Sequence, residues 1–340
     1  MRTVQVTSPG VVSWVDVPTP KTGPNDVLLR IKACGICGSD MLYTEGGGIP
    51  PRQGHTRLGH EPAAEVVEIG DNVSPRDVEI GDHVVIDTMA FTDGFLGSGG
   101  AQGALSEFVV VYDYKPQTQL RKIPKHVPWH VAALNEPMAV ALHAVNRTSP
   151  KQGCKVVVFG AGPIGLGAVL AYRRKGASHI IVVDIVESKL EKALAIGADA
   201  VVKSATTQDL ASKLVELQGD GATAWNRGVR PATDIYLDAA GAPTVPPQVF
   251  NMTKQGATFG VVGVHKKPTE LHMGDLIRTE LNIVFSMGYP TEIFDVTDDI
   301  VENWGNYNDI ISDKFPFEQA VEALELAKSG KANKVVVVFE

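Results

Sequence analysis

One stretch, Gly153 to Asp184, constrains the fold of this 340-residue chain more than any other. It begins with a short β-branched run that has the length and composition of a strand, and glycines follow at positions 160, 162 and 165. Apolar residues then recur at helical spacing until Gly176, and a second apolar run ends at Asp184. The stretch therefore predicts a strand, a glycine turn, a helix and a second strand.

The glycine turn has the spacing that dinucleotide binding requires. Gly160 permits a tight turn, Gly162 lets the backbone approach a pyrophosphate, and Gly165 lets the helix pack closely on the strand. The N-terminus of the helix offers free N–H groups to the phosphates. Asp184 can accept hydrogen bonds from the adenosine ribose and would repel a 2′-phosphate, which favours NAD over NADP. A glycine turn with a structural role alone is the alternative interpretation.

Composition and charge argue against several classes of protein. The formal net charge is −8 at pH 7 and no cluster of Lys and Arg interrupts it, so a nucleic-acid partner is not expected. No apolar stretch has the pattern of a transmembrane helix or a signal peptide, so no membrane partner is expected either. Three cysteines are too few for a disulfide framework and favour a reducing, cytoplasmic location.

The order of the predicted elements suggests two domains. Before residue 150, short apolar runs separated by Gly, Pro, Asp and Asn are typical of a small barrel or sandwich, and one helical pattern extends from Val131 to Val145. From 153 to about 290, strands and helices alternate, which predicts a doubly wound parallel sheet. A helix over 317–326 and a strand over 335–339 follow, and pattern alone does not place them.

A second group of residues has the chemistry of a metal site. Cys37 lies in the motif CGICGSD, His60 and Glu61 lie in GHE, and Glu136 lies in NEP. Thiolate, imidazole and carboxylate groups are good zinc ligands, and three protein ligands with an open position describe a catalytic zinc. From these residues alone, a buried cysteine and a hydrogen-bonded histidine remain the alternative interpretation.

Together, the two groups resemble the zinc-dependent medium-chain alcohol and polyol dehydrogenases. The resemblance spans essentially the whole chain, and the motifs that carry it are CGICGSD, GHEPAAEVVEIGDNV, GDHVVID, NEPMAVALHA, VVVFGAGPIGLGAV and the tail ISDKFPFEQAVEALELAKSGKANKVVV. It implies an α/β chain with two domains. A GroES-like β-rich catalytic domain would span 1–150 and be completed by 291–340, and a Rossmann NAD-binding domain would span 151–290.

The resemblance also implies a role for each residue of the metal group. Cys37, His60 and Glu136 look like ligands of one catalytic zinc. Glu61 resembles the carboxylate that ligates the metal directly or through its bound water. Asp40 looks like the group that orients the ligand histidine.

Substrate and cofactor residues follow from the same resemblance. Ser39 resembles the hydroxyl that takes the substrate's proton, and Tyr43 resembles a substrate-pocket tyrosine of sorbitol-type members. The residues assigned to cofactor binding are Gly160, Gly162, Pro163, Ile164, Gly165, Asp184, Lys189, Gly241, Val262 and Gly263. For the positions at 241 and 263, a plain loop glycine is the alternative.

Two of the departures from the family's pattern concern the metal content and the substrate. The four-cysteine lobe that usually holds a structural zinc has no counterpart, because residues 88–100 contain no cysteine. One catalytic zinc and no structural zinc are therefore expected. The Arg-Tyr pair of sorbitol-type members appears here as Gly288-Tyr289, which weakens the case for a long polyol.

We therefore expect an NAD- and zinc-dependent oxidoreductase that interconverts a small secondary alcohol, such as a polyol or diol, and a ketone. The strand near 281–285 matches the edge through which family members dimerise, so a homodimer or homotetramer is expected. Three alternatives remain open. They are a sugar 1-dehydrogenase of the same family, a zinc-independent quinone or enoyl reductase, and a non-catalytic dinucleotide-binding or structural protein.

Overall fold

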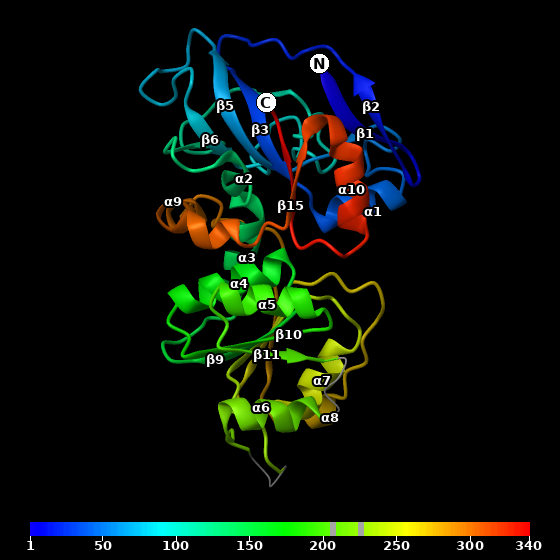
Figure 1. Cartoon of the computed structure of the whole chain (residues 1–340), viewed down its shortest axis with the longest axis vertical. Helices are drawn as coiled ribbons and strands as arrows, with labels where there is room; N and C mark the ends of the chain where they lie inside the picture. Colours follow the sequence, from blue (N-terminus) through cyan, green and yellow to red (C-terminus); the bar gives the residue numbers. More distant parts are fainter. Residues whose placement is uncertain (205–208, 224–227) are drawn as a thin grey trace. The chain divides into compact units, whose positions relative to one another are not determined.

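The computed structural model describes residues 1–204, 209–223 and 228–340, and the chain divides into two units (Figure 1). Unit 1 comprises Met1–Pro137 and Ile293–Glu340, and unit 2 comprises Met138–Glu292. The end of the chain thus returns to the unit formed by its beginning. Among the described residues, no helix is both long and apolar enough to cross a membrane.

Unit 1 is rich in strands. Its strands are β1 (Arg2–Ser8), β2 (Val11–Asp16), β3 (Val27–Gly35), β4 (Thr56–Arg57), β5 (Glu61–Ile69), β6 (His83–Ile86), β7 (Phe108–Val111), β8 (Leu120–Ile123), β15 (Asp313–Pro316) and β16 (Val335–Val338). Its helices are α1 (Gly38–Glu45), α2 (Trp129–Ala132), the start of α3 (Asn135–Arg147), α9 (Asp295–Asn308), η1 (Phe317–Gln319) and α10 (Ala320–Lys328). One sheet has the order β2-β1-β4, and the larger has the order β15-β16-β3-β5-β6-β8 with β7 paired to β3.

The antiparallel pair of β3 and β5 positions the metal motifs. Gly35, at the end of β3, lies opposite Glu61, at the start of β5. Strand β16 pairs with the same end of β3, where Val336 lies opposite Gly35. Because three buried valines begin β16, this strand is stabilised by apolar burial as well as by its ladder. The tail of the chain therefore reaches the region of Cys37 and His60.

Unit 2 contains a six-stranded parallel sheet, which confirms the doubly wound prediction. Its elements are β9 (Lys155–Phe159), α4 (Pro163–Arg174), β10 (His179–Asp184), α5 (Glu187–Ala195), β11 (Ala200–Lys203), α6 (Leu210–Gln218), β12 (Ile235–Asp238), α7 (Val245–Met252), β13 (Thr258–Val261), α8 (Met273–Leu276) and β14 (Asn282–Phe285). The strand order is β11-β10-β9-β12-β13-β14. Helices α4 and α5 lie on one face of the sheet, and α6 and α7 lie on the other (Figure 1). The winding reverses between β9 and β12, where open α/β sheets bind ligands.

The single helical pattern expected from Val131 to Val145 is two helices, α2 and α3. The last turn of α2 tightens, since the N–H of Leu134 bonds the carbonyl of Val131 at 2.9 Å. The side chain of Asn135 then bonds the carbonyl of Ile293 at 2.7 Å. The hydrogen bond between Asn135 and Ile293 thus lies at the boundary between α2 and α3. The apolar periodicity of the sequence continues across this boundary and does not reveal it.

Residues 138–150, which the sequence analysis assigned to the first domain, fall in unit 2. The reason is the packing of α3 on α4. A Cβ placed on Gly167 would lie 2.7 Å from the sulfur of Met138 and 2.9 Å from the Cβ of Ala141. This closeness needs a glycine on α4, and it joins α3 to the dinucleotide half of the chain.

Candidate metal and cofactor sites

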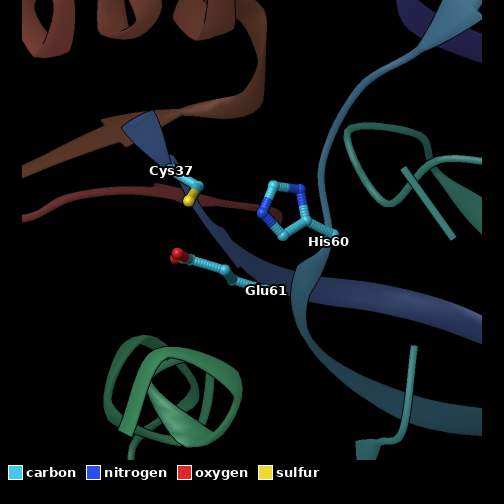
Figure 2. Close-up of side chains that lie close together, drawn as sticks. All are labelled: Cys37, His60 and Glu61. Atoms are coloured by element: carbon cyan, nitrogen blue, oxygen red, sulfur yellow. The ribbon is translucent and has the colours of Figure 1, made fainter. Parts of the chain in front are cut away.

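Three of the predicted metal residues lie together at the end of the β3–β5 pair (Figure 2). Cys37, His60 and Glu61 each offer one ligand atom, and these atoms all lie within 4.8 Å of one another. Figure 2 shows the thiol, the imidazole and the carboxylate converging from the end of β3 and the start of β5. Residues distant in sequence thus form one donor set because the two strands are neighbours.

Asp40 connects two of these side chains. It is fully buried, and its Oδ2 accepts a hydrogen bond from the backbone N–H of Cys37 at 2.9 Å. Its Oδ1 lies 3.5 Å from Nδ1 of His60. With Nδ1 directed toward this carboxylate, Nε2 of His60 is the ring nitrogen left for a metal. Ser39 Oγ lies 3.1 Å from that Nε2, so the expected proton acceptor stands beside the donor set.

Cys34, the other cysteine of CGICGSD, has a different environment. Its side chain is fully buried, and its Sγ contacts the carbonyl of Gly35 at 3.4 Å. Burial raises the pKa of its thiol strongly, with Asp40 adding to the rise. Because zinc binds the thiolate, Cys37 is the better ligand of the two.

A buried lysine completes the site, and the sequence analysis missed it. Lys334 forms an ion pair with Glu61 and donates a hydrogen bond to the carbonyl of Ile36 at 2.9 Å. Burial alone would lower its pKa, but Glu61, Cys37 and Glu136 outweigh burial and raise it. The only sequence signal was a cation directly before the apolar run of β16, and nothing in that pattern tells whether the lysine points inward.

Glu136 lies near the donor set but is not one of the three residues that converge in it. It is buried in the first turn of α3, and burial raises the pKa of its carboxyl to about 8, with Glu61 adding to the rise and His60 opposing it. Its assignment as a zinc ligand stays a prediction.

The residues present fit a zinc ion. Thiolate, imidazole and carboxylate match the preferences of Zn²⁺; His60 and Glu61 are buried, and Cys37 is half-buried. Burial would lower the pKa of His60, yet Asp40 and Cys37 raise it well above its ordinary value. The pocket therefore favours positive charge, which a divalent cation supplies.

The raised pKa of Glu136 predicts how the zinc-free protein responds to pH. The folded state holds this proton more tightly than the unfolded state, whose carboxyl titrates near its ordinary value of 4.5. The resulting stability is fully present below that value and is lost as pH rises to about 8. We expect zinc-free wild type to lose unfolding free energy between pH 6 and pH 9, and Glu136→Gln to lose less. Urea denaturation at both pH values measures this, and equal losses in the two proteins would contradict it.

The three glycines of the dinucleotide turn have the backbone geometry expected of them: a tight turn at Gly160, an open side at Gly162 and close packing at Gly165. Gly160 has φ +97°, a backbone conformation that L side chains rarely adopt. A Cβ on Gly165 would lie 1.8 Å from the carbonyl oxygen of Gly160, so the helix packs directly on the turn. A Cβ on Gly162 would have no atom of the described residues within 4 Å. That open side is where a pyrophosphate can approach the backbone.

Asp184 is the last residue of β10, and its side chain contacts the backbone of the dinucleotide turn. Its Oδ2 accepts from the N–H of Ala161 at 2.7 Å, and its Oδ1 accepts from those of Ile185 and Val186 at 2.7 and 2.9 Å. The carboxylate is half-buried, so its position beside the turn suits a ribose diol. The other residues assigned to this cofactor lie at the start of α4 (Pro163, Ile164), within α5 (Lys189), and after β12 and β13 (Gly241, Val262, Gly263).

Tyr43 lies on α1 and donates a hydrogen bond to Ser98 Oγ at 3.3 Å. Ser98 belongs to residues 88–100, which stand where the family usually has its four-cysteine lobe. Phe91 and Leu96 of this segment are buried in the core of unit 1. Apolar packing therefore anchors the segment in this chain.

Comparison with known proteins identifies both halves of the chain. A family model described as the alcohol dehydrogenase GroES-like domain matches residues 23–125, and one described as zinc-binding dehydrogenase matches residues 163–302. A sorbitol dehydrogenase from Bombyx mori is 31% identical, over 94% of this chain and 93% of that protein. The chain belongs to the zinc-binding dehydrogenase family. This dehydrogenase is thus an oxidoreductase of the alcohol dehydrogenase type, with zinc and a nicotinamide dinucleotide as its cofactors and a small molecule as its substrate.

Solved structures support the same conclusion. The crystal structure of 2R,3R-butanediol dehydrogenase from Bacillus subtilis has a TM-score of 0.84 to this dehydrogenase, with 28% identity and 99% of each chain covered. A zinc-binding dehydrogenase from Sinorhizobium meliloti 1021, bound to NADP, has a TM-score of 0.83 and 26% identity, and covers 99% of this chain and 98% of its own. The predicted GroES-like and Rossmann fold is thereby confirmed.

Proposed function

We propose that this dehydrogenase uses NAD to interconvert a secondary alcohol and a ketone, with a polyol or a vicinal diol as the substrate class. The observation that carries the proposal is the convergence of Cys37, His60 and Glu61 in a chain that also has a complete dinucleotide turn. The relatives named for sorbitol and butanediol support the substrate class. The replacement of the Arg-Tyr pair by Gly288-Tyr289 favours the shorter diols within it.

The side chains of unit 1 suit the chemistry of alcohol oxidation. Zinc held by Cys37, His60 and Glu61 would supply a Lewis acid that makes an alcohol hydroxyl more acidic, and a nicotinamide dinucleotide held at the glycine turn would supply the hydride acceptor. Ser39 Oγ, beside the donor set, is placed to take the hydroxyl proton. Asp40 lies beside Nδ1 of His60 and orients the ring, and Lys334 pairs with Glu61 and balances its charge.

The preference for NAD over NADP rests on Asp184. Its carboxylate occupies the place where a 2′-phosphate would bring negative charge, and no arginine follows it, since Ile185 and Val186 are the next residues. A related structure holds NADP, so the preference has to be measured in this chain.

The test is reduction of NAD and of NADP with a panel of vicinal diols, polyols, aldoses, threonine and hydrophobic secondary alcohols. We expect activity on the diols or polyols, a kcat/KM at least about 10-fold higher with NAD than with NADP, and loss of activity on treatment with a zinc chelator. Oxidation of aldoses alone would favour a sugar 1-dehydrogenase. Reduction of quinones or enoyl compounds that survives chelation would favour the zinc-independent reductases. Absence of turnover with intact zinc would favour a non-catalytic protein.

We also propose that the protein assembles as a homodimer or homotetramer through β14. This strand is an edge of the unit 2 sheet, and apolar residues near it are strongly exposed: Ile277, Phe285 and Met287 are 77%, 69% and 90% accessible. Edge pairing between two copies would cover them. Light scattering of the purified protein measures the assembly. A cytoplasmic location, supported by three free cysteines, is proposed as well and is open to cell fractionation.

A further inference from the structure

Asp238 holds two loops at the point where the winding of the unit 2 sheet reverses. It ends β12, where it lies opposite Phe159 of β9 and Val261 of β13. Its side chain is fully buried. Its Oδ1 accepts the N–H groups of Ala240 and Gly241, each at 2.9 Å. One carboxylate oxygen therefore fixes the loop that follows β12.

The other carboxylate oxygen holds the loop that follows β13. Nε2 of His265 lies 2.7 Å from Oδ2 of Asp238, and the histidine side chain is only 18% exposed. The backbone carbonyl of Asp238 accepts the N–H groups of Val262 and Gly263 at 3.0 and 2.9 Å. The neutral or charged imidazole can donate from Nε2, so this bond to a buried carboxylate is charge-assisted. Asp238 thus holds the first residues of the loop after β13, through two backbone hydrogen bonds and the side chain of His265.

Backbone contacts show how tightly these loops fit. A Cβ on Gly263 would lie 2.2 Å from the backbone nitrogen of Gly241, and one on Gly241 would lie 2.5 Å from the carbonyl oxygen of Val264. A Cβ on Gly160, in the dinucleotide turn, would lie 3.0 Å from the backbone nitrogen of Ala240. Three loops therefore meet backbone to backbone, and a small shift of one displaces the others.

We propose that His265 is a positioning residue for the nicotinamide nucleoside of the cofactor, and that it acts through Asp238. The inference rests on the nicotinamide cofactor of the family and not on the substrate proposed above. In a doubly wound sheet the dinucleotide crosses the reversal point. The adenosine half of a dinucleotide bound in this way would lie toward Asp184 and the glycine turn, and the other half would extend toward the ends of β12 and β13. His265 and Asp238 hold the two loops at those ends, so they preorganise one half of the site.

The experiment compares two ligands that share the adenosine and the diphosphate. NADH carries the nicotinamide nucleoside and ADP lacks it. Calorimetric titration of His265→Ala is expected to show NADH binding weakened about 10-fold, because one charge-assisted hydrogen bond is lost, while ADP binding changes less than about 2-fold. His265→Gln, whose amide can donate to Asp238, is expected to recover most of the affinity for NADH. His272→Ala serves as the matched control, since His272 is an exposed histidine of the same connection.

Each outcome decides the proposal. Unchanged NADH binding in His265→Ala would overturn it, and so would an equal loss for NADH and ADP, which would assign the pair a role in folding alone. If His265→Ala does not fold, the same two titrations of His265→Asn supply the test, because its shorter amide does not reach the position of Nε2 that bonds Asp238. Failure of the wild type to bind NADH would instead refute the cofactor assignment, so the two failures are distinguishable.

Discussion

Replacement of Cys37 by Ala is expected to remove zinc from the protein and to lower kcat/KM for alcohol oxidation by at least about 1,000-fold. Cys37 is the only thiolate donor in the group formed with His60 and Glu61 among the described residues. Without it, the site keeps an imidazole and a carboxylate, and these hold zinc much more weakly. Metal analysis of the purified variant and the rate of NADH formation measure the two effects.

Cys154→Ala is the matched control, because Cys154 is a free, buried cysteine of unit 2. It is expected to keep its zinc and its activity. If Cys37→Ala retains stoichiometric zinc, the ligand assignment is wrong. If it loses zinc but keeps its activity, the metal is not part of the reaction.

Replacement of Lys334 by Met is expected to lower the unfolding free energy of the zinc-free protein by about 3–5 kcal/mol. The substitution keeps the length of the side chain but removes the cation that pairs with Glu61. Glu61 is 1% exposed, so its carboxylate would remain charged without a partner, or would take up a proton at a cost in free energy. Urea denaturation at pH 7 measures the loss.

Two further variants separate this effect from a general loss of packing. Lys331→Met changes an exposed lysine of the same segment and should leave the stability within about 0.5 kcal/mol of wild type. The double variant Lys334→Met with Glu61→Gln removes both charges and should recover part of the stability. A Lys334→Met protein as stable as wild type would mean that Glu61 does not depend on this lysine.

Much of both sites could be predicted because the signals are local. The glycine spacing at 160, 162 and 165 reflects backbone constraints within one turn, and Asp184 ends the next apolar run. His60 and Glu61 are adjacent, and Cys37 directly precedes α1, so their motifs survive in a single sequence. The parallel sheet of unit 2 follows from strand–helix alternation of the same local kind.

The missed residues depend on partners that belong to other strands or loops of the sheets. Lys334 becomes part of the metal site only because β16 pairs with β3, and its buried position reverses the usual expectation for a lysine. The pairing of His265 with Asp238 requires β12 and β13 to be neighbours, and neither residue belongs to a recognisable motif. The division of one helical pattern into α2 and α3 likewise depends on a contact with residue 293.

The sequence by itself therefore determined the dinucleotide turn, the motifs of the metal ligands and the strand–helix alternation that is typical of the parallel sheet of unit 2. These properties are encoded within a few residues of one another, where backbone geometry and side-chain chemistry act directly. Asp40 was expected beside His60, but only the tertiary structure decided that Lys334 pairs with Glu61 and that His265 pairs with Asp238. Strand pairing brings together charges that are hundreds of positions apart in the chain, and their burial then determines their protonation and their strength of interaction.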